Sequence, residues 1–362
     1  MKLRGELSKF SRGIRDFMLP ETLSLDEPMN HKSDSIIFDN KLRKRKRIVM
    51  LTTGCDVGTC TMCPFPNESL ANVKSINLCN QFDNSFPNDS ISNFELITIF
   101  CNGNFFSDRD INIDARLHIY RAFNNSSASI LCVESLPQFI TDETIATFKK
   151  ECPDKQLACF VGFQSSNDFV REVAINTTCT KNNFEKVVKL FNDNNYLIIP
   201  FVMIKPTFML EDEAINDTLA TLHYLSELGI KQATLCPTRV APNTVLELLY
   251  NDGMYQPPWI WSVIEILKHW SDYNGLIPMV NTTELKPDKN LDSVCAYGCP
   301  SCHDEVITTL EKFLYNRDFK LLENLSCGCE LDYLEFKIDE FQKLGKYTIE
   351  QRINIFLEKH KK

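Results

Sequence analysis

Residues 48–63 read IVMLTTGCDVGTCTMC, a short run of β-forming residues followed by a loop with three cysteines. The run 48–53 is apolar and partly β-branched, which predicts a buried strand that ends at Gly54. Cys55, Cys60 and Cys63 follow with the spacing C-x4-C-x2-C. In parallel α/β barrels the active site lies at the carboxyl ends of the strands. The stretch therefore predicts a metal-binding loop at the mouth of a barrel.

The chain beyond this loop alternates between short apolar runs and longer helical segments, and the runs predict strands buried on both faces. The predicted strands are 94–100, 127–134, 157–163, 196–204 and 231–236, with 276–281 as an additional edge strand. The clearest predicted helices are 108–123, 141–151, 182–192, 211–228 and 259–270. Six strand–helix units in order predict an α/β fold, a TIM-like partial (β/α)6 barrel over residues 47–282.

The two ends of the chain differ from this pattern. Residues 1–46 show little periodicity and are interpreted as an N-terminal extension that packs over the barrel. Residues 283–362 begin with a polar, linker-like stretch and then carry a second group of cysteines. Helices are predicted near 303–316, 331–343 and 347–360. This region is interpreted as a small, Cys-rich, metal-binding helical module.

Composition and charge restrict the class of protein. The chain has 362 residues, of which 43% are hydrophobic, and no apolar run approaches the length of a membrane span. The N-terminus has no apolar core typical of a secretion signal, so we expect a cytoplasmic protein. The net charge of −9 disfavours nucleic-acid binding unless positive charge gathers in one place. The basic run 41–47 is either a solvated stretch before the first strand or a contact for nucleic acid or an acidic substrate.

The first cysteine group suits an iron–sulfur cluster. Three neighbouring thiolates favour a soft metal, and a closed zinc site would need a fourth ligand that the nearby sequence lacks. A [4Fe-4S] cluster held by three cysteines leaves one iron open. In radical S-adenosylmethionine (SAM) enzymes, such an iron chelates SAM, and one electron then releases a 5′-deoxyadenosyl radical that takes hydrogen from the substrate. The alternative is three buried or zinc-bound cysteines in a scaffold without catalysis.

The second cysteine group favours zinc. Cys299-x2-Cys302 and Cys327-x-Cys329 supply four thiolates, enough for a tetrahedral ion with no open position. Cys295 is then a spare or neighbouring thiol. An auxiliary iron–sulfur cluster and unligated thiols remain as alternatives.

Seven stretches, in order along the chain, resemble the RaSEA family, the radical SAM proteins of archaeosine synthesis. That family is related to the radical SAM domain of the elongator catalytic subunit. The likeness covers residues 45–335 approximately. The stretches are GTCTMCPFPNES (58–69), FCNGNFFSDRDI (100–111), VESLPQFIT (133–141), VGFQSSNDFVRE (161–172), MIKPTFMLEDEAI (203–215), CPTRVAPNTVLELLY (236–250) and GMYQPPWIWSVIEIL (253–267).

The resemblance implies roles for residues that follow the predicted strands. Near the cluster and SAM it implies contacts by Met62 (adenine), Asn102, Gly103, Asn104 and Phe105 (ammonium), Glu134 (amino group, ribose or substrate), Gln164 (ribose) and Arg171 (carboxylate). On the rim that faces the substrate it implies Lys205, Arg239 and Asn243.

The resemblance also implies a reaction and partners. The family cleaves a C–N bond of a lysine-modified 7-deazaguanine in tRNA by a radical route, together with a lysine-transferring partner that binds tRNA. An electron donor such as flavodoxin or ferredoxin is expected. The acidic chain leaves open a different substrate, such as a small molecule, a nucleoside or a natural-product precursor.

Overall fold

The computed structural model describes residues 2–16, 23–39, 41–55, 57–270, 275–287 and 293–361. Eight strands form one curled sheet in chain order, with β1 (Asn30–Phe38) antiparallel to β2 (Lys41–Met50) and every later pair parallel. The later strands are β3 (Leu96–Cys101), β4 (Ile130–Ser135), β5 (Gln156–Gln164), β6 (Leu197–Ile204), β7 (Gln232–Pro237) and β8 (Ile277–Val280). The predicted partial barrel is confirmed.

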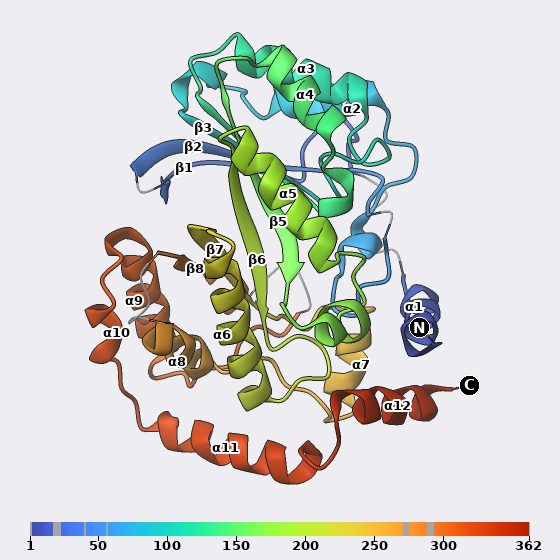
Figure 1. Ribbon diagram of the computed structural model, residues 1–362, viewed down its shortest axis with the longest axis vertical. Helices are drawn as coiled ribbons and strands as arrows, with labels where there is room; N and C mark the ends of the chain where they lie inside the picture. Colours follow the sequence, from blue (N-terminus) through green and yellow to red (C-terminus); the bar gives the residue numbers. More distant parts are fainter. Residues whose placement is uncertain are drawn as a thin grey trace.

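Helices cover the outer face of the sheet (Figure 1). They bury alternate strand residues such as Ile48, Ile97, Leu131 and Leu157 in the main core. The covering helices are α2 (Ser75–Asn84), α3 (Ile113–Asn124), α4 (Asp142–Glu151), α5 (Lys181–Asp193), α6 (Glu211–Glu227) and α8 (Ile260–Trp270), and α7 (Val245–Asn251) follows β7 in the chain. The predicted strands and helices of the barrel are therefore all present, with boundaries shifted by a few residues.

The basic run is placed differently from our first interpretation. Residues 41–47 belong to β2, which begins seven residues before the predicted strand. The interpretation of this run as a solvated stretch before the strand is therefore wrong. Side chains alternate between the two faces along a strand, so the run is not uniformly solvated. Lys46 is buried on the outer face beside the rings of Phe86 and Phe94, and Arg45 and Arg47 point to the inner face. Strand β1, rich in polar residues, was not predicted at all.

The C-terminal helices pack against the outside of the barrel. They are α9 (His303–Asn316), α10 (Lys320–Glu323), α11 (Cys329–Leu344) and α12 (Ile349–His360). Helix α9 contacts both edge strands, β1 and β8, and Tyr315 donates a hydrogen bond to the carbonyl of Ser35 at 2.8 Å. The first helix, α1 (Lys2–Gly13), packs near α12 through an edge-to-face contact of Phe10 with Phe356. None of the described helices combines the length and apolar character that a bilayer crossing needs.

Candidate metal and cofactor site at the barrel mouth

The three barrel cysteines lie in a loop that crosses the carboxyl end of the sheet. Gly54 begins the loop with a φ of +82°, and a Cβ there would lie 2.3 Å from the Cβ of Ser69, so glycine is required. The N–H of Cys55 donates to the carbonyl of Asn102 at 3.1 Å, and the N–H of Thr61 donates to the carbonyl of Ile175 at 2.9 Å. These bonds fix the loop against the end of β3 and the segment after β5.

The thiols are arranged for a metal cluster. Burial raises the pKa of Cys60 to about 12 and also raises that of Cys63, and each is raised further by a neighbouring thiol of the group. Thiols this close and this poorly solvated become thiolates when a cation neutralises them. Within the described residues, their three sulfurs do not form a group within 4.8 Å, as one tetrahedral ion needs. Three thiols in one loop are the donor set of a [4Fe-4S] cluster with one open iron, so the residues present fit such a cluster.

Arg15 is a residue of this site that the sequence did not reveal. Its guanidinium donates to the carbonyls of Cys60 at 2.7 Å and Cys63 at 2.6 Å. Arg12, at the end of α1, donates to the carbonyl of Val57 at 3.3 Å. Electrostatic attraction to Arg15 lowers the pKa of the Cys60 and Cys63 thiols against the effect of burial. The N-terminal segment thus supplies a positive charge directly beside the cysteine loop, although its sequence shows no motif.

Replacing Arg15 with glutamine should weaken the cluster site without unfolding the barrel. The amide keeps a donor but removes the positive charge, so a bound anionic cluster should become harder to reduce. We expect a lower reduction potential by spectroelectrochemistry and fewer irons per chain after anaerobic purification. Arg12→Gln is the matched control, because Arg12 contacts the same loop but does not reach the cysteine carbonyls. Equal potentials in the two variants would contradict this role.

The loop after β3 is organised by Asp110, another residue that sequence reasoning missed. Its carboxylate accepts a hydrogen bond from the N–H of Asn104 at 2.7 Å. A Cβ on Gly103 would lie 2.2 Å from a carboxylate oxygen of Asp110, so this glycine is required by close packing rather than by a special φ. Asn104 also donates to the sulfur of Cys55 at 3.5 Å. The loop therefore touches the cysteine group, as expected for a cofactor-binding segment.

The side chains of two residues that were predicted to contact SAM, Phe105 and Met62, point into the protein interior. The ring of Phe105 is fully buried in the main core, and only its N–H, which donates to the carbonyl of Glu134 at 2.9 Å, belongs to the loop geometry. The side chain of Met62 is buried in an apolar cluster with Val170 and Phe208. The predicted contacts of these two residues with SAM would therefore have to involve their backbone groups.

Glu134 and Gln164 stand at the ends of β4 and β5 with unused polar atoms. Burial raises the pKa of Glu134 to about 8, and its carboxylate has no hydrogen-bond partner in the part of the chain that the structure describes. The side-chain oxygen of Gln164 is likewise buried without a partner, and its φ is +73°. A non-glycine residue in that region is strained, and such strain concentrates at functional sites. Both residues remain candidates for SAM or substrate.

Arg171 is not available to the SAM carboxylate. Its side chain is fully buried, and its guanidinium donates to the carbonyls of Ser165 and Cys179 and to the carboxylates of Asp168 and Glu172. The prediction is corrected on this ground: the residue holds the turn after β5, including the π-helix Val170–Ala174, in place.

The predicted substrate rim also requires correction. Lys205 is fully buried, with ion pairs to Glu211 at 2.6 Å and to Glu340 on α11 at 2.8 Å. Burial lowers the pKa of Lys205, but the two carboxylates outweigh it and raise the pKa overall. Arg239 is committed to Glu284, Ser293 and the carbonyls of Thr283 and Lys286.

Asn243 lies near the cysteine loop rather than on a separate rim. Its carbonyl accepts a hydrogen bond from Arg15 at 3.4 Å, and its φ is +56°. Its N–H donates to the carboxylate of Glu247 at 2.8 Å, at the start of α7. The turn after β7 is therefore joined to the cluster loop through Arg15.

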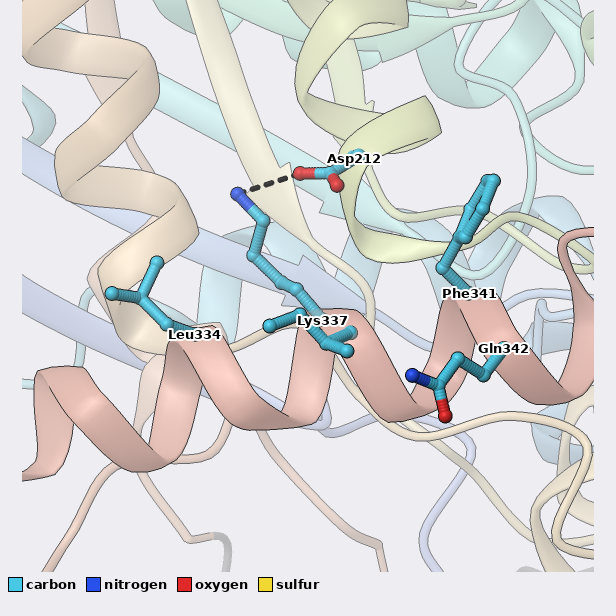
Figure 2. Close-up of a pocket in the computed structure, with 6 residues that line it drawn as sticks. Asp212, Leu334, Lys337, Phe341 and Gln342 are labelled. Carbon is cyan, nitrogen blue, oxygen red and sulfur yellow. Dashed lines mark ion pairs between the residues drawn. The ribbon is translucent and has the colours of Figure 1, made fainter.

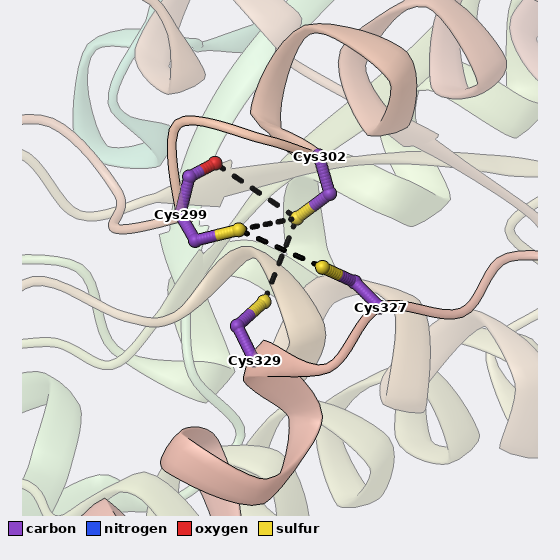
Figure 3. A group of neighbouring side chains, drawn as sticks. All are labelled: Cys299, Cys302, Cys327 and Cys329. Atoms are coloured by element: carbon purple, nitrogen blue, oxygen red, sulfur yellow. Dashed lines mark hydrogen bonds between the residues drawn. The ribbon is translucent and has the colours of Figure 1, made fainter.

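The four C-terminal cysteines converge as predicted (Figure 3). Their ligand atoms all lie within 4.8 Å of one another, with sulfur–sulfur distances of 3.5 Å for Cys299–Cys302 and 3.6 Å for Cys299–Cys327 and Cys302–Cys329. The indole N–H of Trp261 donates to the sulfur of Cys329 at 3.1 Å. Cys295 lies outside this group of four.

A surface hollow on α11 is separate from both cysteine groups. It is lined by Asp212 of α6 and by five residues of α11 that include Leu334 and Phe341. Figure 2 shows Lys337 reaching Asp212 across it, an ion pair of 2.6 Å. The hollow contains none of the predicted cofactor residues, so we assign it no part in the site.

Comparisons with known proteins support the resemblance. No protein-family model matches the chain. An uncharacterized protein of Methanocaldococcus jannaschii is 29% identical over 308 residues, 82% of this chain and 83% of that protein. Archaeosine synthase subunit beta of Methanosarcina acetivorans is 23% identical over 345 residues, covering 92% of this chain and 97% of that protein. Among solved structures, an N-terminally truncated Elp3 of Methanocaldococcus infernus matches 66% of this chain and 58% of its own with 12% identity and a TM-score of 0.47. The alignment with the archaeosine synthase subunit confirms the predicted similarity to the radical SAM proteins of archaeosine synthesis.

Proposed function

We propose that the protein is a radical SAM enzyme that cleaves a C–N bond of a lysine-modified 7-deazaguanine in tRNA. The observation that carries the proposal is the cysteine loop at the barrel mouth of a chain that aligns almost end to end with an archaeosine synthase subunit. The fold alone would allow many reactions, because one barrel architecture serves many chemistries. The whole-length similarity is what selects the substrate class.

The proposed cofactor is a [4Fe-4S] cluster held by Cys55, Cys60 and Cys63, which with bound SAM supplies a 5′-deoxyadenosyl radical. The residues of the chain position these groups and exclude water. Arg15 holds the carbonyls of two cysteines, and the loop 102–104 contacts the third. Glu134 and Gln164 offer unpaired polar atoms beside the mouth.

Zinc is the proposed occupant of the C-terminal cysteines. Four sulfurs bound to one tetrahedral zinc lie about 3.8 Å apart, given a Zn–S distance of about 2.3 Å. The distances of 3.5 and 3.6 Å are close to this value. A cubane iron–sulfur cluster would hold its cysteines further apart, because each sulfur binds a different iron. The alternative of an auxiliary cluster is therefore less consistent with the geometry.

A partner is proposed to supply the contacts to tRNA. The net charge of −9 is unlike that of a protein that binds tRNA alone. A lysine-transferring protein with tRNA-binding parts would provide the missing positive charge, and flavodoxin or ferredoxin would provide electrons. The same negative charge supports the second candidate, a radical SAM enzyme for a smaller substrate.

Turnover of modified tRNA tests the proposal. The reconstituted protein should form 5′-deoxyadenosine and archaeosine from SAM, dithionite and tRNA that carries the lysine-modified base. The control substrate is the same tRNA with the unmodified 7-cyano-7-deazaguanine base, and each reaction is repeated with the lysine-transferring partner. Formation of 5′-deoxyadenosine without archaeosine in all reactions would favour the smaller substrate. Purified protein with zinc but no iron or sulfide would favour a scaffold without catalysis.

A further inference from the structure

Strand β2 places a row of arginines on the inner wall of the barrel. Residues alternate in direction along a strand, and Ile48 and Met50 point outward into the main core. Arg43, Arg45 and Arg47 therefore point inward. The basic run that the sequence left unassigned is thus divided by the pleat, with Lys44 and Lys46 on the outer face and the three arginines on the inner face.

Among the residues that the structure describes, Arg47 is the arginine of this row with a buried nitrogen that has no hydrogen-bond partner. Arg45 makes two bonds to Asp34, at 2.8 and 2.7 Å, and Arg43 pairs with Glu95 at 3.8 Å. The Nε of Arg47 is buried and has no partner. Thr98 lies beside Arg47 in the register of β2 and β3, and its hydroxyl is also buried without a partner. Buried polar groups that lack partners are costly, so a ligand or water is required here.

A carboxylate and an aromatic row face the same space. Glu134 is on β4 and, like Arg47, points inward. Cys132, on the same face of β4, is close enough to interact with both charged groups: burial raises the pKa of its thiol most, Arg45 lowers it and Glu134 raises it further. The inward rings of Phe100, Phe160 and Phe201 stack in a row, with centroid distances of 5.5 and 5.1 Å. The interior therefore offers a cation, an apolar wall and a carboxyl group whose pKa is raised by burial to about 8, which a bound ammonium group would keep ionised.

We propose that this wall binds the α-amino-acid end of the substrate, with its carboxylate on Arg47 and Thr98 and its ammonium group on Glu134. The inference deepens the proposed function and rests on it, since it names how the lysine of the modified base is held. Paired groups of opposite sign suit a zwitterion. A phosphate dianion fits less well, because the Glu134 carboxyl group would have to stay protonated beside it and would supply no opposite charge.

The position of Arg47 explains the direction in which the substrate would enter. Arg47 lies three residues before the end of β2, about 10 Å below the barrel mouth at 3.3 Å per residue. A lysine anchored there extends its side chain upward along the aromatic row toward the cysteine loop. The carbon attached to the modified nitrogen then approaches the mouth, and the base and the tRNA remain outside. Such an arrangement admits a tRNA without requiring it to enter the barrel.

Paired substrates and paired variants test this inference. The two substrates are tRNAs modified with lysine and with 1,5-diaminopentane, which lacks the carboxylate. Wild-type protein should prefer the lysine substrate in kcat/KM by about 10- to 100-fold, the effect of a hydrogen-bonded charge. Arg47→Gln should lose this preference through a higher KM for the lysine substrate alone. Arg47→Lys should retain part of the preference, because the positive charge remains.

The controls separate this inference from the proposed function. Arg43→Gln changes an inward arginine of the same strand that is already paired, and it should keep the wild-type preference. Iron content and circular dichroism identify any variant that has lost its cluster or fold. Wild-type turnover of both substrates with equal efficiency would overturn the inference and leave the proposed function standing. Turnover of neither substrate would overturn the proposed function and, with it, this assignment.

Discussion

Cys63→Ala should abolish SAM cleavage while leaving the barrel folded. The variant removes one of three thiolates, and two cannot hold a cluster with an open iron. Cys63 also interacts electrostatically with two neighbours: Arg15 lowers the pKa of its thiol and Cys60 raises it. We expect 5′-deoxyadenosine formation to fall about 1000-fold or more, as for loss of an essential catalytic group. Iron and sulfide content should fall in parallel.

The control for this experiment is a buried cysteine outside the loop. Cys159 on β5 is fully buried in the main core and belongs to neither cysteine group. Cys159→Ala leaves a small cavity and should cost only modest stability, with iron content unchanged. Full iron content in Cys63→Ala, or equal loss in both variants, would contradict the assignment of the three ligands.

The barrel could be predicted because its strands are apolar on both faces. Runs such as 94–100 and 196–204 carry their own signal, and their order along the chain is also their order in the sheet. Strand β1 lacked that signal because it is an edge strand with exposed polar residues from Asn30 to Ser33. Its partner β2 was predicted only from residue 48 onward, and the basic residues before it are recognised as strand only through their pairing with β1 and β3.

The positions of the two cysteine groups were predictable, and the partners of the charged residues were not. Spacing is a local property, and it predicted the convergence of the four C-terminal cysteines; position after a strand predicted that Cys55, Cys60 and Cys63 lie at the carboxyl end of the sheet. The role of a charged side chain depends on its partner, which is often distant in sequence. Lys205 and Glu340 are 135 residues apart, yet their ion pair decides that the lysine is structural. Arg15 shows the converse, because its role arises from docking of a segment without any periodic pattern.

The C-terminal metal site should matter for stability rather than for chemistry. Its cysteines come from the start of α9 and from the segment that begins α11, and Trp261 of α8 donates to one of them. A bound ion would therefore join three helices. The Lys205–Glu340 pair is a second connection between the barrel and α11, so loss of the metal should loosen the C-terminal helices without releasing them completely.

Cys302→Ala should remove one zinc per chain and lower the thermal stability substantially. Three remaining thiolates would bind the ion poorly. The sulfur of Cys302 lies 3.5 Å from that of Cys299 and 3.6 Å from that of Cys329. We expect a loss of about 3 kcal/mol or more and a Tm lower by about 5–10 °C. Metal analysis and calorimetry measure both effects.

Cys295→Ala is the matched control, because Cys295 is nearby in sequence but outside the group of four. Iron content should be unchanged in both variants, since the barrel cysteines lie on a different loop. A Cys302→Ala protein that keeps its zinc and its Tm, or that loses iron instead of zinc, would contradict a structural zinc site.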